Sequence, residues 1–186
     1  MTLFRTRSGH QLPSRVFSAP MAGYTDPPYR ILMKEFGIPV LFTEMIDSHA
    51  LIYRNEKTIK MLGRRDPDLH TQIAAGTPLL AEKSMEVLME HQTAGININM
   101  GCPDKSIEKQ GSGAALCKNP PLARELIRSA KIGCQNKLPV SVKIRLGYNK
   151  DILEEWLPEL LAEDVAAITI HARTRKEMSK VPAHWN

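Results

Sequence analysis

Short apolar runs alternate along the chain with longer, more mixed runs, and glycine or proline separates most of them. The short runs predict six strands, over residues 16–19, 40–44, 70–74, 96–100, 139–145 and 165–171. The longer runs predict helices over residues 27–36, 49–62, 79–93, 121–134 and 152–163, whereas the glycine-rich residues 110–115 are expected to form a plain loop. Asp26 is the predicted N-cap of the first helix. Strands that alternate with helices predict a parallel α/β sheet.

The turn after the first strand distinguishes between two parallel architectures. It reads Pro20-Met21-Ala22-Gly23, not the Gly-x-Gly-x-x-Gly of open, doubly wound nucleotide-binding sheets. The spacing instead favours a (β/α)₈ barrel of the TIM type, which usually needs about 250 residues. With 186 residues and about six strands, we predict one domain, residues 1–186, that is an incomplete barrel. Barrel edges left uncovered by missing strands are expected to favour self-association.

Polar side chains stand at the carboxyl ends of the predicted strands, where parallel barrels place their active sites. Gln72, Asn99, Lys143 and His171 belong to four of these strands, and Cys102 directly follows the fourth. Each has a structural alternative, since a lone cysteine can be a small core residue, a lysine can extend to solvent, and a buried glutamine or histidine can satisfy backbone groups. Together, they are predicted to line one pocket, in which a lysine and a histidine face a planar anionic ring such as a flavin.

Composition narrows the class of protein. Hydrophobic residues make up 42% and charged residues 24% of the chain, as in ordinary globular domains. No apolar run approaches the roughly 20 residues that span a bilayer, and the first ten residues lack the apolar core of a secretory signal, so we expect no membrane partner. The three cysteines have no metal-ligand spacing, so we predict no metal site, and free thiols suit a cytoplasmic location. A net charge of +5 is compatible with an RNA partner.

Five motifs in fixed order give the chain a family resemblance. They are residues 19–26 (Ala-Pro-Met-Ala-Gly-Tyr-Thr-Asp), 99–103 (Asn-Met-Gly-Cys-Pro), 111–116 (Gly-Ser-Gly-Ala-Ala-Leu), 142–147 (Val-Lys-Ile-Arg-Leu-Gly) and 171–174 (His-Ala-Arg-Thr). From about residue 15 onward, this pattern resembles the tRNA-dihydrouridine synthases. The resemblance implies an FMN-binding (β/α)₈ barrel followed by a helical tRNA-binding domain. It also implies reduction of the C5–C6 bond of particular tRNA uridines, with FMN recharged by NADPH.

The resemblance assigns roles to individual residues. Pro20, Met21 and Ala22 match a segment whose backbone lies along the FMN ring. Gln72 and Lys143 match flavin ligands, and His171 matches a histidine close to the flavin. Asn99 matches an asparagine near the flavin and the target uracil, and Cys102 matches the catalytic cysteine. We further predict that Arg173, at the rim, binds the RNA substrate.

The chemistry itself calls for an acid near the uracil. Hydride addition at C6 builds negative charge over C5 and O4, so a proton donor is needed close to C5. A thiol with an ordinary pKa of about 8.5 is mostly protonated at neutral pH and can donate. Gly101 allows the chain to turn before Cys102, and Pro103 ends the strand pairing after it. Lys105 and Lys109 are expected to lower the thiol pKa, which opposes this role.

Two other functions remain open at this point. Another FMN barrel reductase, of the dihydroorotate-dehydrogenase type, also places asparagine, lysine and cysteine at strand ends. A non-catalytic remnant that only contacts RNA is the second alternative. In a TIM barrel, the phosphate site is usually built from the loops after strands seven and eight. Because only about six strands are predicted, these loops are missing, and we expect the isolated chain to bind FMN weakly and to show little activity.

Overall fold

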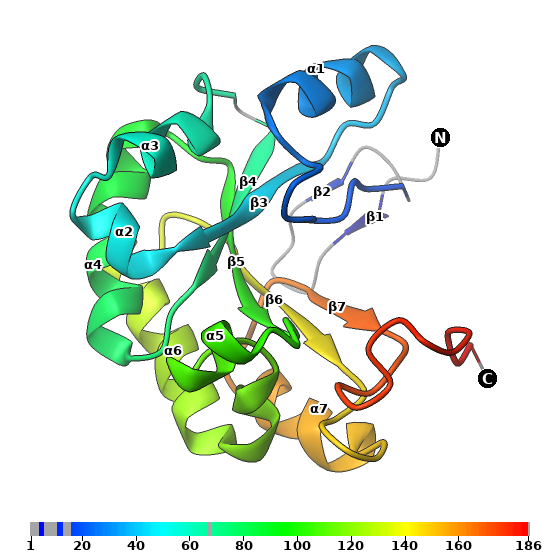
Figure 1. Cartoon of the computed structure of the whole chain (residues 1–186). Helices are drawn as coiled ribbons and strands as arrows, with labels where there is room; N and C mark the ends of the chain where they lie inside the picture. The colour runs from blue at the N-terminus through cyan, green and yellow to red at the C-terminus, as the bar shows by residue number, and fades with distance from the viewer. Residues whose placement is uncertain (1–3, 6–10, 13–15, 67, 186) are drawn as a thin grey trace.

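The computed structural model describes residues 4–5, 11–12, 16–66 and 68–185. Five parallel strands form one twisted sheet, and their order in the sheet is their order in the sequence (Figure 1). The strands are β3 (Leu41–Asp47), β4 (Leu69–Ala74), β5 (Gly95–Met100), β6 (Val140–Arg145) and β7 (Ile168–His171). This sequential, parallel order confirms the predicted class: the sheet is an incomplete TIM-type barrel.

Helices connect the strands and cover one face of the sheet (Figure 1). They are α1 (Pro27–Glu35), α2 (Ser48–Ile52), α3 (Glu56–Leu62), α4 (Pro78–His91), α5 (Lys105–Lys109), α6 (Pro120–Gly133) and α7 (Leu153–Leu161), with a 3₁₀ helix η1 (Gly113–Lys118). Apolar residues of α4, α6 and α7 form one core cluster with the helix-facing positions of the strands. Among the described helices, none is long and apolar enough to cross a membrane.

Strand β5 shows how the sequence divides between the two faces of the sheet. Ile96, Ile98 and Met100 are fully buried in the core cluster beneath the helices. Because side chains alternate along a strand, Asn97 and Asn99 face the opposite side, which is the barrel interior. The strand is therefore buried along its whole length but carries a polar inner face.

Several predicted elements are confirmed and others are corrected. Asp26 caps α1, since its side chain accepts a hydrogen bond from the backbone N–H of Tyr29 at 3.0 Å. The predicted first strand, residues 16–19, is reduced to a single parallel bridge between Phe17 and Val40, so the sheet has five strands and not six. The predicted helix 49–62 is two helices, because Arg54 adopts a left-handed φ of 51° and Asn55 caps a new helix.

Two further features depart from the prediction. The glycine-rich residues 110–115 are not a plain loop, because they directly follow α5 and their second half already belongs to η1. Near the N-terminus, β1 (Phe4–Arg5) and β2 (Gln11–Leu12) form a short antiparallel pair that the sequence pattern did not indicate.

The sheet has two open edges. Strand β7 pairs only with β6 among the described strands, and its Thr169 and Ile170 are exposed. At the other edge, Val16 and Phe17 lie beside β3 with much of their side chains in solvent. The barrel interior is therefore accessible between these edges. Whether copies of the chain associate there stays a prediction.

Candidate active site

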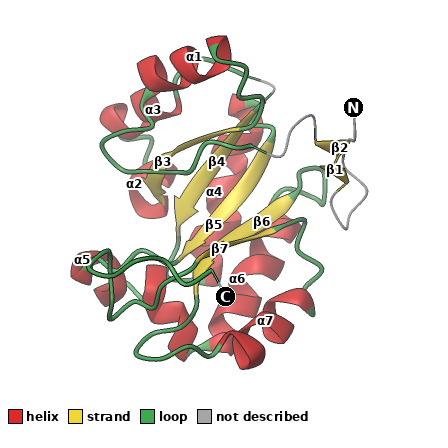
Figure 2. Cartoon of the chain, turned by 90° about the vertical axis from the view of Figure 1, so that its right-hand side faces the viewer, coloured by secondary structure: helices red, strands yellow, loops and turns green. Residues whose placement is uncertain are grey.

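A pocket of about 430 Å³ lies at the carboxyl ends of the strands, and we call it the carboxyl-end pocket. Its edge of the sheet is the one where α5 and the C-terminal loops gather (Figure 2). The lining residues are Ala19, Pro20, Met21, Ala22, Met45, Gln72, Asn99, Gly101, Cys102, Pro103, Lys143, Arg145 and His171. The pocket thus brings together all the predicted site residues except Arg173, which contacts His171 from outside the pocket lining.

The amides of Gln72 and Asn99 form one wall of the pocket and hold each other in place. Asn99 Nδ2 donates to Gln72 Oε1 at 2.8 Å, and both side chains are buried. Asn99 Oδ1 accepts two backbone hydrogen bonds, from Gly101 at 3.1 Å and from Cys102 at 2.8 Å. The strand-end asparagine therefore fixes the turn that carries the thiol.

The Cys102 turn is also fixed from its other side. Its carbonyl oxygen accepts a hydrogen bond from the backbone N–H of Ala114 at 2.9 Å. Gly113 makes this approach possible, because a Cβ at that position would lie 2.7 Å from the Cys102 carbonyl oxygen. Gly113 also has a φ of +63°, which favours glycine. Gly113 and Ala114, in the glycine-rich segment, therefore help to hold the backbone that carries the thiol.

Burial raises the pKa of the Cys102 thiol. The negative charges of Asp104 and Glu108 also raise it, whereas a hydrogen bond from the Asp104 backbone and the charge of Arg145 act in the opposite direction. The expectation that nearby lysines lower this pKa was wrong, because the local balance is set by burial and two carboxylates. The thiol is thus protonated at neutral pH, as a proton donor must be.

Two cations from β6 reach the pocket. Burial lowers the pKa of Lys143, and the neighbouring charge of Arg145 lowers it further. The Lys143 ammonium makes no hydrogen bond to the described residues, so it is available to a ligand acceptor. Arg145, which sequence reasoning did not single out, donates from Nε to the Gly101 carbonyl at 2.7 Å. The sequence could have indicated Arg145 through its position two residues after Lys143, which places both side chains on the same face of the strand.

His171 is held as a neutral imidazole. Its Nε2 lies 3.0 Å from Nη1 of Arg173, and a guanidinium can only donate, so Nε2 is the acceptor and Nδ1 carries the proton. Burial lowers the pKa of His171 to about 4, helped by the charges of Arg145, Lys143 and Arg173. Of the two side chains predicted to face an anionic ring, only Lys143 can therefore contribute a charge.

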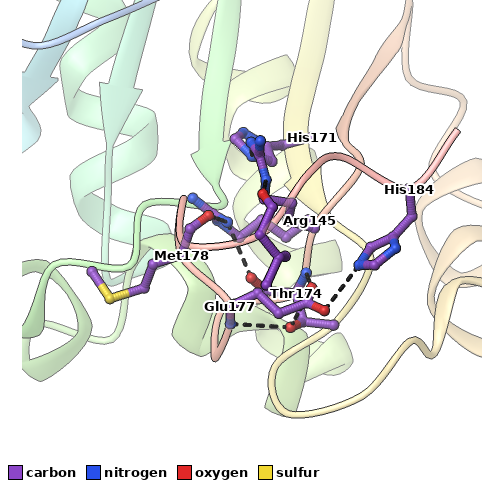
Figure 3. Close-up of polar contacts among 8 residues, drawn as sticks. Arg145, His171, Thr174, Glu177, Met178 and His184 are labelled. Atoms are coloured by element: carbon purple, nitrogen blue, oxygen red, sulfur yellow. Dashed lines mark hydrogen bonds and ion pairs between the residues drawn. The ribbon is translucent and has the colours of Figure 1, made fainter.

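A hydrogen-bonded C-terminal loop packs against Arg145, one of the residues that line the pocket (Figure 3). Arg145 Nη1 donates to the carbonyl oxygens of Thr174 and Met178, at 3.1 and 2.9 Å. Glu177 accepts from the backbone N–H of Thr174 at 2.7 Å and contacts His184 Nε2 at 2.9 Å. These hydrogen bonds hold the pKa of Glu177 at about 2. One buried arginine thus joins the loop after β5 to the loop after β7.

A second, partly buried set of contacts joins the loop after β5 to the loop after β7. Arg175 forms a bidentate ion pair with Glu108, at 2.8 and 2.6 Å. Tyr148 donates its hydroxyl to Glu108 at 3.2 Å, and the Lys118 ammonium lies 3.8 Å above the Tyr148 ring. Because both Nε and Nη2 of Arg175 donate to Glu108, Arg175 stabilises the loop structure more than it adds to a free basic surface.

The pocket chemistry suits a flat ligand that is rich in acceptors. Asn99 Oδ1 already accepts two hydrogen bonds and Gln72 Oε1 accepts one, so these side chains offer mainly their remaining N–H groups. Lys143 and His171 Nδ1 add further donors. The carbonyl oxygens and ring nitrogens of a pyrimidine or a flavin match this set. Within the described part of the chain, no cluster of three or more histidine, cysteine or acidic residues could hold a metal ion.

A second cavity, of about 420 Å³, opens at the amino ends of the same strands, and we call it the amino-end cavity. Its walls include Phe17, Val40, Phe42, Ala166 and Ala167, so most of its surface is apolar. The side chains of Asn97 and Ser141 are its main polar features beside Lys143 and His70. Lys143 lines both cavities and thus marks their boundary.

The fold and the pocket together define a barrel-type α/β protein with a protonated thiol among fixed donors at the carboxyl ends of its strands. Comparison with known families identifies it further. The family model described as dihydrouridine synthase (Dus) matches residues 17–186. The chain therefore belongs to the dihydrouridine synthase family.

Curated relatives from several bacteria agree with this assignment. The chain is 39% identical over 183 residues to the "probable tRNA-dihydrouridine synthase 2" of Bacillus subtilis (strain 168), covering 94% of this chain and 55% of the relative. It is 35% identical over 166 residues to a "probable tRNA-dihydrouridine synthase" of Helicobacter pylori (strain ATCC 700392 / 26695), covering 87% and 50%. A Staphylococcus aureus (strain Mu50 / ATCC 700699) relative is 38% identical over 183 residues. The chain spans about half the length of these relatives.

Proposed function

We propose that this chain forms the flavin-binding, catalytic part of an enzyme that reduces the C5–C6 bond of tRNA uridine. The observation that carries the proposal is the convergence of Cys102, Asn99, Gln72 and Lys143 on one pocket in a member of the dihydrouridine synthase family. Family membership favours this reading over a reductase of free pyrimidines. The free thiols at positions 102, 117 and 134 support action in a reducing cytoplasm.

The donor set of the pocket fits FMN. Gln72 and Lys143 would hold the acceptor-rich pyrimidine end of the ring, with the segment from Pro20 to Ala22 along one side. A cation at that end stabilises the reduced, anionic form of the ring. His171, as a neutral donor through Nδ1, would add a hydrogen bond without a second charge. Bound FMN, recharged by NADPH, would supply hydride for uracil C6.

Cys102 would hold the proton that the other carbon requires. Its Sγ–H donates to C5 as negative charge develops there, and the resulting thiolate regains a proton from solvent. Asn99 fixes the backbone on which this thiol stands. The target uridine must leave its stack to enter the pocket. Arg173 donates hydrogen bonds to His171 Nε2 and to the Val181 carbonyl oxygen. Its remaining N–H groups would bind an RNA phosphate at the rim of the pocket.

Two experiments test this function. In a chimera, this chain replaces the aligned 183 residues of the Bacillus subtilis relative, and the protein is expressed in a bacterial strain that lacks dihydrouridine synthases. We expect dihydrouridine to reappear in its tRNA, as measured by mass spectrometry of digested tRNA. A soluble, folded chimera that leaves the tRNA unmodified would contradict the proposal. For the isolated chain we expect weak FMN binding, and a stoichiometric yellow chromophore after purification would contradict that expectation.

A further inference from the structure

Four polar side chains form a continuous hydrogen-bonded row across β6, β5 and β4. Ser141 Oγ accepts from Asn97 Nδ2 at 2.9 Å, and Asn97 Oδ1 accepts from Gln72 Nε2 at 2.7 Å. Gln72 Oε1 accepts from Asn99 Nδ2 at 2.8 Å, which completes the row. All four residues are at least nine-tenths buried. We call this row the amide relay.

The amide relay has a fixed direction. Ser141 donates its only hydroxyl proton to the carbonyl oxygen of Ile96 at 3.0 Å, so towards Asn97 it can only accept. Because Ser141 Oγ accepts, Asn97 must point Nδ2 toward Ser141 and Oδ1 toward Gln72. Gln72 then donates from Nε2 to Asn97 and accepts at Oε1 from Asn99 Nδ2. This leaves Asn99 Oδ1 facing the backbone. The last acceptor in the row receives the N–H groups of Gly101 and Cys102. A hydroxyl on β6 thus determines the orientation of every amide up to the thiol turn.

The relay connects the two cavities. Asn97 and Ser141 line the amino-end cavity, whereas Gln72 and Asn99 line the carboxyl-end pocket. A buried amide in the wrong orientation would place two donors or two acceptors against each other, which costs about as much as an unpaired polar group. Each link therefore strongly disfavours the flipped state of the next one.

We infer that Ser141 and Asn97 are positioning residues, which act through Gln72 and Asn99 to fix the Cys102 turn and to aim amide N–H donors at the ligand. Neither residue lines the carboxyl-end pocket. The inference deepens the proposed function of the same site, since those donors would face the flavin or the uracil. The relay itself, however, can be tested without flavin, RNA or turnover.

The test is the pH dependence of Cys102 alkylation in the purified chain. Iodoacetamide is added at a series of pH values, and the modified Cys102 peptide is quantified by mass spectrometry. In Ser141→Ala, Asn97 loses its acceptor and the amides are free to flip, so the thiol turn loosens and water reaches the sulfur. We expect the alkylation rate of Cys102 at pH 7 to rise about 3- to 10-fold, with the midpoint of the profile moved to lower pH.

Matched variants separate positioning from general loss of stability. Ser84→Ala removes another fully buried hydroxyl, which donates to the Leu80 carbonyl on α4 at 2.7 Å, and it should leave the Cys102 profile unchanged. Ser141→Thr keeps the hydroxyl and has the space of the amino-end cavity for its methyl group, so it should restore the wild-type profile. If Ser141→Ala does not fold, Asn97→Leu breaks the relay at the next link and should shift the profile in the same direction.

Two results would overturn the inference. One is a Cys102 profile in folded Ser141→Ala, or in folded Asn97→Leu, that superimposes on that of the wild type. The other is an equal shift in Ser84→Ala, which would indicate a general loosening. Either result would leave the proposed function intact. A chimera without dihydrouridine activity, in turn, would not affect the alkylation result.

Discussion

The two cavities of this chain are built on the same strands yet differ in chemistry. The carboxyl-end pocket presents a thiol, two amides, an ammonium and an imidazole. The amino-end cavity presents mainly aromatic and aliphatic side chains. In barrel enzymes, residues at the carboxyl end of the strands perform the chemistry, and those at the amino end contribute stability. The comparison therefore predicts that substitutions at the carboxyl end change turnover and ligand affinity, whereas substitutions at the amino end change stability.

The amide relay qualifies this division. Asn97 and Ser141 are polar side chains that line the amino-end cavity, and Asn97 accepts a hydrogen bond from Gln72, which lines the carboxyl-end pocket. The stable end of the sheet thus contributes to the geometry of the functional end. The following predictions test how complete the separation is, in order of decreasing effect.

Replacing the thiol should give the largest effect. In the chimera, Cys102→Ala removes the proposed proton donor, so dihydrouridine formation should fall about 10²- to 10⁴-fold. FMN binding should remain, because the flavin contacts are assigned to other residues. Cys134→Ala is the matched control, since Cys134 is fully buried at the end of α6 and outside both cavities. Single-turnover reduction of tRNA measures the rate, and unchanged turnover in Cys102→Ala would remove this residue from the mechanism.

Lys143 lies at the boundary of the two cavities, and its loss should act on the ligand. Lys143→Met keeps the length of the side chain but removes the charge, so FMN affinity of the chimera should fall about 10- to 100-fold, as for the loss of one hydrogen bond to a charged group. Stability should not fall, because the unpaired ammonium already pays a desolvation penalty, visible as a lowered pKa. Flavin fluorescence titration gives the affinity, with Lys118→Met as the control outside the pocket. Equal affinities would show that Lys143 does not contact the cofactor.

A substitution in the amino-end cavity should act on stability alone. Phe42 is half-buried there, with its ring centroid 5.3 Å from that of His70. Phe42→Ala should lower the free energy of unfolding by about 1 to 3 kcal/mol, less than for a fully buried aromatic residue. Urea denaturation measures this loss. The Cys102 alkylation profile should stay that of the wild type, and a shift comparable to that of Ser141→Ala would show that the two ends are not separable.

The sequence predicted the fold and most of the pocket because both follow from strand ends. Once β5 is placed from its apolar run, Cys102 must lie at its carboxyl end, and parallel pairing brings Gln72 and Lys143 to the same edge. The helix break at Arg54 was not predictable in the same way. The break depends on a left-handed backbone at a residue type that carries no turn signal.

Charge effects and tertiary hydrogen bonds were the least accessible from the sequence. Nearness in sequence suggested that Lys105 and Lys109 lower the Cys102 pKa, but burial, Asp104 and Glu108 dominate in the folded chain. Arg145 was missed because its role comes from carbonyl groups of two distant loops. Such partners are defined only when the loops are placed in three dimensions.

The smallest predicted effect is a pH dependence of stability that arises at the functional end. His171 has a pKa of about 4 in the folded chain and the ordinary value of about 6.5 when unfolded. Between these values the unfolded chain binds the extra proton, so this residue makes the protein less stable as the pH falls from about 6.5 towards 4. His171→Gln should reduce this loss, while His91, whose pKa is also lowered, stays in both proteins. The difference in urea midpoints at pH 7 and pH 5 measures the effect, and NMR titration of the His171 ring locates its midpoint. A midpoint near 6.5 would mean that burial and the charges of Arg145 and Lys143 do not hold this imidazole neutral, and that below this pH His171 adds a third cation to Lys143 and Arg145 at the carboxyl-end pocket.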